Sequence, residues 1–110
     1  MTNFPHERVV RYLDYPREKG ELPVFNSARD EFIRPDWMAI TRVAESPNHP
    51  ETFILYMLTT EGEILDLVQR SSLEIALDEA KSIAGLSHSA WNVCDVVMSE
   101  WDLMPRAVIR

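Results

Sequence analysis

The chain has 110 residues, of which 11 are Lys or Arg and 18 are Asp or Glu, so its formal net charge is −7. This length suits one compact domain, and a hydrophobic fraction of 45% is typical of a globular protein and excludes a fully disordered chain. The single cysteine excludes an internal disulfide framework and a cysteine-rich zinc site.

Apolar runs and the N-terminal residues bear on where the protein resides. The longest uninterrupted apolar run is Phe53–Leu58, far shorter than the ~20 residues that a membrane span requires. The first residues show no basic segment followed by an apolar one, so we expect no secretory signal. Together with the lone cysteine, these features predict a cytoplasmic protein without a membrane partner.

Negative charge is concentrated in the C-terminal two-thirds of the chain. Residues 1–35 carry six basic and six acidic side chains, whereas residues 36–110 carry five basic and twelve acidic ones. Such a surface repels DNA, RNA and anionic lipid, and it attracts a basic protein. We therefore expect no nucleic-acid partner. The same charge also serves to keep a small domain soluble, so it does not by itself define a binding site.

The N-terminal third of the chain carries weak signals. Residues 8–15 are rich in β-branched and aromatic side chains, which predicts a short strand. Residues 16–25 contain breakers and predict an irregular connection. Residues 26–32 predict one short helical turn, because Asn26 or Ser27 can cap it.

Three strands are expected next, arranged as a meander. Residues 38–45 alternate between two faces, and residues 52–60 are apolar on both faces, as in a central strand. Glu61 and Gly62 predict a two-residue hairpin turn, since glycine reaches positive φ at little steric cost. The chain then returns as a third strand over residues 63–69. Alternation in this third strand groups Ile64, Asp66 and Val68 on one face and Leu65 and Leu67 on the other.

A helix with signals at both ends follows the meander. The residues Ser71-Ser72-Leu73-Glu74 predict a capping box, in which the side chains of Ser71 and Glu74 bond to each other's backbone N–H groups. Gly85 is expected to end the helix in the left-handed conformation. Residues 90–98 alternate again and predict a fourth strand. The apolar stripe of the helix consists of Leu73, Ala76, Leu77, Ala80, Ile83 and Ala84.

This order of elements predicts an α+β fold, with an antiparallel sheet (β-meander, helix, strand) and one main helix packed on one face. We expect a single domain over residues 1–110. It comprises a weakly specified N-terminal segment, 1–36, a β-β-β-α-β core, 37–98, and a C-terminal tail, 99–110. The tail is expected to pack on the core, because its apolar groups would otherwise form an exposed patch.

Catalytic and metal-binding patterns are missing from the sequence. His6, His49 and His88 have no second ligand at metal-binding spacing, and no cation that could activate a thiol lies near Cys94 in the sequence. The three glycines are isolated, so no phosphate-binding loop is predicted. We expect a protein that is not an enzyme, with no catalytic residue, no metal and no cofactor.

Acidic and aromatic side chains are the remaining candidates for a binding surface. Trp37 and Trp101 adjoin acidic residues, and either is a candidate for a partly exposed aromatic anchor, because tryptophan is enriched at binding hot spots. The acidic candidates are Glu61, Glu63 and Asp66 near the hairpin turn and Asp78 and Glu79 on the helix.

Residues 56–80 join a hairpin with a Glu-Gly turn to a helix of pattern Ser-Leu-Glu-x-Ala-Leu-x-x-Ala, and a Trp-bearing strand follows. Over residues 37–98 this arrangement resembles the small acidic immunity proteins of bacterial polymorphic toxin systems, which bind and block a toxin. The resemblance rests on structural motifs, so it carries over no functional residue. It implies an acidic protein-binding module whose partner is a basic protein such as a toxin.

Two other functions remain open. One is a structural or self-assembling domain that forms a homodimer through a sheet edge and the apolar tail. The other is a small-molecule-binding protein, with a pocket between sheet and tail that contains His88 and a carboxylate.

Overall fold

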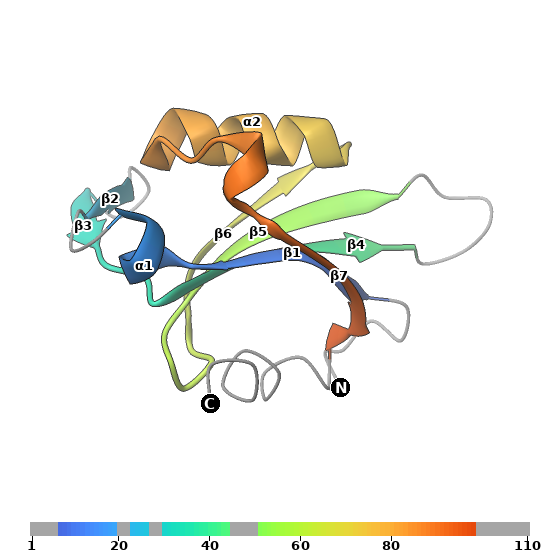
Figure 1. The fold of residues 1–110 in the computed structure, drawn as a ribbon, viewed down its shortest axis with the longest axis horizontal. Helices are drawn as coiled ribbons and strands as arrows, with labels where there is room; N and C mark the ends of the chain where they lie inside the picture. Colours follow the sequence, from blue (N-terminus) through green and yellow to red (C-terminus); the bar gives the residue numbers. More distant parts are fainter. Residues whose placement is uncertain (1–6, 20–22, 27–29, 45–50, 99–110) are drawn as a thin grey trace.

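A computed structural model of the protein describes residues 7–19, 23–26, 30–44 and 51–98 (Figure 1). The predicted tail and Trp101 lie outside these ranges. None of the helices described is long and apolar enough to cross a membrane. The elements in chain order are β1 (Arg8–Asp14), α1 (Tyr15–Lys19), β2 (Val24–Asn26), β3 (Glu31–Ile33), β4 (Trp37–Val43), β5 (Thr52–Leu58), β6 (Ile64–Arg70), α2 (Leu73–Ala84), the 3-10 helix η1 (His88–Ala90) and β7 (Asn92–Val97).

Five strands form one antiparallel sheet in the order β6-β5-β4-β1-β7, and β2 and β3 form a separate hairpin. The long helix α2 lies across one face of the sheet, as Figure 1 shows. The predicted α+β fold, with an antiparallel meander and one main helix, is confirmed. β1 has a larger role than expected, because the last strand, β7, joins the meander only through it.

Both faces of the central strands are buried. On the face that α2 covers, Met38, Ile40 and Leu55 are completely buried together with Ala76 and Ala80 of the helix. On the opposite face a second cluster of buried side chains includes Trp37, Ala39, Ile54 and Tyr56. Side chains of a strand alternate between faces, so burial on both sides explains why β5 is apolar throughout.

The N-terminal third differs from its prediction in two places. α1 stands where an irregular connection was expected, and the backbone N–H of Arg17 donates to Oδ1 of Asp14 at 3.1 Å, which caps the start of this helix. The helical turn predicted over residues 26–32 is wrong at its described ends, because Asn26 belongs to β2 and residues 31–33 form β3, which pairs with β2; residues 27–29 lie outside the described ranges. Val24 and Ile33 join the cluster beneath α2, so tertiary burial outweighed the local capping signal.

The connection between β5 and β6 is a three-residue loop. The N–H of Thr59 donates to the carbonyl of Glu63 at 2.9 Å, and the N–H of Gly62 donates to the carbonyl of Thr59 at 2.9 Å. The loop is thus Thr60, Glu61 and Gly62, and the predicted two-residue turn is wrong. Gly62 has a φ of 89°, in the left-handed position that loops of this length require.

A β-bulge at the start of β6 changes which residues share a face. Pairing passes from Leu58 opposite Ile64 to Met57 opposite Asp66, so Leu65 is skipped. Ile64 therefore lies on the side of the sheet away from α2, and Leu65 packs against the helix-side cluster. The predicted grouping of Ile64 with Asp66 was wrong because a simple alternation takes no account of a bulge.

α2 spans Leu73–Ala84, and the side chain of Ser72 accepts the N–H of Ile75 at 3.1 Å. The helix therefore begins one residue later than the predicted capping box, and the cap at Ser71 was wrong. At the other end Gly85 has a φ of 68° and donates its N–H to the carbonyl of Lys81 at 2.9 Å, which confirms the predicted left-handed end.

The two neighbouring serines provide a direct test of this cap. Ser72→Ala is expected to lower the free energy of unfolding by about 1 kcal/mol, because the Ile75 N–H loses its acceptor. Ser71→Ala, one residue earlier and exposed, is expected to change it by less than about 0.5 kcal/mol. Urea denaturation measures both. A larger loss in Ser71→Ala than in Ser72→Ala would contradict the observed cap.

Candidate functional site

Acidic side chains at the β5–β6 loop are exposed and held on an ordered backbone. The N–H of Thr60 donates to Oδ2 of Asp36 at 2.8 Å, and the N–H of Glu63 donates to Oγ1 of Thr59 at 3.0 Å. These bonds fix the loop that carries the exposed carboxylates of Glu61 and Glu63. Among the described residues no cation pairs with either carboxylate.

Asp66 is the third residue of β6, which begins directly after the loop and Glu63, and its side chain is half-buried. Its Oδ1 accepts the backbone N–H of Leu67 at 2.8 Å. The carboxylate therefore lies against the backbone of β6, the end strand of the sheet. The structure thus places Glu61 and Glu63 on the loop and Asp66 on the adjoining part of β6.

The acidic residues of α2 form a separate group. Oε1 of Glu79 accepts from both Nη2 and Nε of Arg70, at 2.9 and 3.2 Å, and Asp78 bonds to Nε2 of His88 at 2.8 Å. Glu79 is thus held beside Arg70 at the far end of β6, and the seven residues of β6 separate that end from the loop by about 20 Å. Because each has its own partner, Asp78 and Glu79 do not extend the unpaired acidic surface of the loop.

Of the two tryptophans considered as aromatic anchors, the one within the described residues is buried. Trp37 is 7% exposed and packs against Tyr12, with ring centroids 6.4 Å apart and planes inclined at 46°. The expected partial exposure of Trp37 is therefore wrong. Burial follows from its place at the start of β4, where its side chain joins the cluster opposite α2. Trp101 lies outside the described residues.

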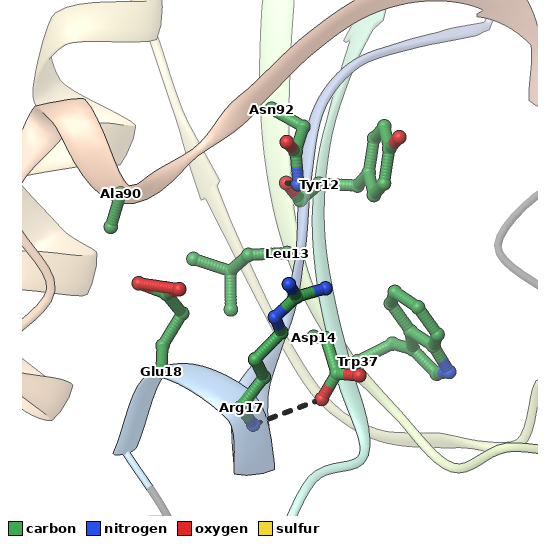
Figure 2. A pocket seen from close by; sticks show the side chains of 8 residues that line it. All are labelled: Tyr12, Leu13, Asp14, Arg17, Glu18, Trp37, Ala90 and Asn92. Carbon is green, nitrogen blue, oxygen red and sulfur yellow. Dashed lines mark hydrogen bonds between the residues drawn. The ribbon is translucent and has the colours of Figure 1, made fainter. Parts of the chain in front are cut away.

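A cleft of about 440 Å³ lies beside α1, where the end of β1 meets the start of β7 (Figure 2). Its charged groups are of both signs, with Arg17 between the carboxylates of Asp14 and Glu18. His88, the histidine expected in a small-molecule site, does not line it. The cleft is lined by Tyr12, Leu13, Asp14, Arg17, Glu18, Trp37, Ala90 and Asn92.

A buried polar cluster on the sheet face opposite α2 was missed by the sequence analysis. The hydroxyl groups of Thr41 and Tyr56 both donate to Oε2 of Glu7, each at 2.7 Å, and all three residues are buried. The carbonyl of Glu7 also accepts the N–H of Met98 at 3.0 Å. Glu7 therefore joins the start of β1 to β4, to β5 and to the end of β7.

Glu7, Thr41 and Tyr56 form a structural anchor, that is, a buried set of hydrogen bonds that holds strands of the sheet together. Burial, and then the hydrogen bond to Glu7 and its negative charge, raise the pKa of Tyr56 well above its ordinary value of 10.0. The phenol thus stays protonated near neutral pH and acts as a donor. Polar side chains inside an apolar strand are a sequence signal for a buried partner, but that signal does not identify which distant residue supplies it.

Nucleophile and metal chemistry find no support in the described segments. The thiol of Cys94 is half-buried and donates to the carbonyl of Val9 at 3.3 Å. Burial raises the pKa of this thiol, so the reactive thiolate is disfavoured. Within residues 7–19, 23–26, 30–44 and 51–98, no three side chains of His, Cys, Asp or Glu are grouped so that they could hold a metal ion.

Comparison with known proteins gave no relative of this chain. It matches no protein-family model, and neither curated proteins nor solved structures contain a match to it. A function must therefore be inferred from the geometry and charge of the residues described above.

Proposed function

We propose that the protein is an acidic protein-binding module, which binds a basic partner through the β5–β6 loop and the adjoining part of β6. One observation carries this proposal. The carboxylates of Glu61 and Glu63 are exposed on a loop that hydrogen bonds hold in place, and no cation among the described residues neutralises them. Asp78 and Glu79 of α2, in contrast, bond to His88 and Arg70.

The physical advantage of this arrangement lies in its order and its charge. A loop that is already fixed loses little conformational entropy when a partner binds, so more of the interaction energy appears as affinity. A formal net charge of −7 adds a long-range field that draws a basic protein towards the surface and speeds association.

We propose further that the basic partner is a toxin and that the protein acts as an immunity protein. This narrower role is supported by the resemblance over residues 37–98 and by the match between an acidic domain and toxins that attack nucleic acid, whose own surfaces are basic. Such a protein neutralises its toxin by covering the active surface, so it needs a docking surface and no catalytic group.

Charge reversal at the loop tests the proposal. The triple variant Glu61→Lys, Glu63→Lys and Asp66→Lys is expected to slow association with the basic product of a neighbouring gene by about tenfold or more at low salt. The reason is that the variant turns local attraction into repulsion. Surface plasmon resonance at several salt concentrations measures the association rate, and the difference between variant and wild type should shrink as salt rises.

The control variant changes the same number of charges elsewhere. Glu18→Lys, Glu31→Lys and Glu74→Lys alter three exposed carboxylates on α1, β3 and α2. This control has the same net charge as the loop variant but keeps Glu61, Glu63 and Asp66. We expect it to bind faster than the loop variant. Equal association rates for the two triple variants would show that only total charge matters, and no binding by the wild type at low salt would disprove the proposal.

A further inference from the structure

The outer edge of β6 carries backbone groups that bond to no other strand of the described sheet. β6 is the end strand of the sheet, and it pairs on its inner side with β5. The N–H of Asp36 donates to the carbonyl of Leu58 at 2.8 Å, whereas the N–H of Thr59 donates to the carbonyl of Glu63 at 2.9 Å. The N–H and C=O groups of Leu58 therefore point towards β4, and those of Thr59 point towards β6.

This alternation determines which peptide groups of β6 face outwards. Backbone groups of a strand point alternately to either side, so Leu55 and Met57 of β5 bond towards β6. Their partners in the register are Val68 and Asp66. Leu67 and Gln69, which lie between and beyond these partners, consequently point their N–H and C=O groups away from the sheet. In the part of the chain that the structure describes, no strand pairs with this edge.

Two side-chain hydrogen bonds agree with that assignment and occupy part of the edge. Asp66 accepts the N–H of Leu67 at 2.8 Å, and Nη1 of Arg70 donates to the carbonyl of Gln69 at 2.6 Å. Both are bonds from a neighbouring side chain to an outward backbone group. Among the described residues, no hydrogen bond engages the outward carbonyl of Leu67 or the outward N–H of Gln69, so this part of the edge offers one acceptor and one donor to an incoming strand.

We infer that an extended basic segment of the partner adds to the sheet as a strand along β6. Its backbone bonds to the outward groups of Leu67 and Gln69, while its Lys or Arg side chains pair with Glu63 and Asp66. Its apolar side chains cover Ile64 and Leu67, which are 47% and 43% exposed. This inference rests on the proposed function and names how the partner binds at the same surface.

Charge complementarity favours such a partner over a second copy of this chain. Two copies would each bring a formal charge of −7, and their mutual repulsion opposes association. The cation of β6 itself is already engaged, because Arg70 is bonded to Glu79 and to the carbonyl of Gln69. A segment with alternating basic and apolar side chains satisfies both the acidic and the apolar groups that line this edge.

Two probes separate strand addition from simple charge attraction. The first is a blocked synthetic peptide of alternating Lys and Val, and the second is the same peptide with methyl groups on alternate backbone nitrogens, which removes donors from one edge. The full-length protein is titrated with each, and the backbone amides are followed by NMR. We expect the first peptide to shift the Leu67 and Gln69 amides and to bind about fivefold or more tightly than the methylated one.

A proline variant gives a matched test on the protein side. Gln69→Pro removes an outward N–H without removing a bond to β5, since proline is tolerated at the edge of a sheet. It is expected to weaken binding of the first peptide about fivefold or more, whereas Gln69→Ala keeps the backbone N–H and changes affinity less than about twofold. Circular dichroism checks that both variants fold.

The outcomes distinguish the two proposals. Equal binding of both peptides, or equal affinity of the proline and alanine variants, overturns strand addition and leaves the acidic docking surface in place. Binding of neither peptide at low salt overturns strand addition as well, and the charge-reversal experiment then decides the proposed function separately. Concentration-dependent dimerisation in analytical ultracentrifugation that Gln69→Pro abolishes would show that a second copy, and not a basic partner, occupies the edge.

Discussion

Replacement of Leu77 by aspartate is expected to unfold the protein. Leu77 is 8% exposed and packs among the side chains that α2 buries against the sheet. An aspartate there loses its hydration and leaves a cavity, and together these effects cost about 4 kcal/mol or more. A domain of this size has a total stability of about 5–15 kcal/mol, so most or all of it would be lost.

The same helix supplies the control. Ile75 lies two residues away and is 44% exposed, so Ile75→Asp adds the same charge on the solvent side of α2. We expect it to lower the free energy of unfolding by less than about 1 kcal/mol. Circular dichroism with urea denaturation measures both variants. An unchanged midpoint in Leu77→Asp would contradict the observed packing of α2 on the sheet.

Tyr56→Phe is expected to have the second large effect. The substitution removes one of the two hydroxyl groups that donate to the buried Oε2 of Glu7 and leaves only Thr41. Hydrogen bonds to a charged group contribute about 1.5–3 kcal/mol, so we expect a loss of that size at neutral pH. Thr41→Val, which removes the other donor at similar volume, should cost a similar amount. Losses below about 0.5 kcal/mol in both variants would contradict the anchor.

The same hydroxyl makes stability depend on alkaline pH. The pKa of Tyr56 in the folded protein is raised above its ordinary value of 10.0. The stability contributed by the protonated phenol is therefore fully present below about pH 10 and is lost as the pH rises through the folded value. Wild type should lose stability as the pH rises above about 10, and Tyr56→Phe should lose less over the same range.

A second tyrosine serves as the comparison for this pH dependence. Burial also raises the pKa of Tyr15, which lies in α1 and outside the Glu7 cluster. Tyr15→Phe should remove a separate part of the alkaline dependence and leave the contribution of Tyr56 unchanged. If wild type and Tyr56→Phe have the same slope of stability against pH, the proposed protonation of Tyr56 is wrong.

Local signals predicted several elements well. α2 was expected from an apolar stripe at helical spacing, and its end at Gly85 from the need for a left-handed residue. The meander followed from alternation and from an apolar run, Phe53–Leu58, that a turn containing Gly62 follows. These features depend on residues within a dozen positions of each other, where the periodicity of a helix or a strand is visible directly.

Errors arose where two local solutions differ by a small energy. Ser71 and Ser72 can both cap a helix, and in the structure Ser72 has the extended backbone and accepts the N–H of Ile75. The bulge at Leu65 moved Ile64 to the other face, although the alternation in the sequence does not distinguish a bulged register from a regular one. The strand of residues 31–33 formed because Val24 and Ile33 gain burial beneath α2, a benefit that a capping pattern does not reveal.

The candidate site was predicted in part. The acids near the β5–β6 loop were named from the sequence, and the structure places Glu61 and Glu63 in solvent. Pairing of Glu79 with Arg70, nine residues earlier, was not foreseen, because it requires α2 to fold back on β6. Burial of Trp37 was missed for a similar reason, since the residues that pack around it come from other strands.

By itself, the amino-acid sequence determined the helix, the meander and the strongly negative charge of residues 36–110, because each is a property of neighbouring residues or of composition. Only the tertiary structure decided that β1 lies between β4 and β7, that Glu7 accepts from Thr41 and Tyr56, and that no strand among the described residues pairs with the outer edge of β6. The two hydrogen bonds to Glu7 join residues 34 and 49 positions apart in the chain. Which distant residues meet depends on how the apolar faces pack together, and no local pattern encodes that choice.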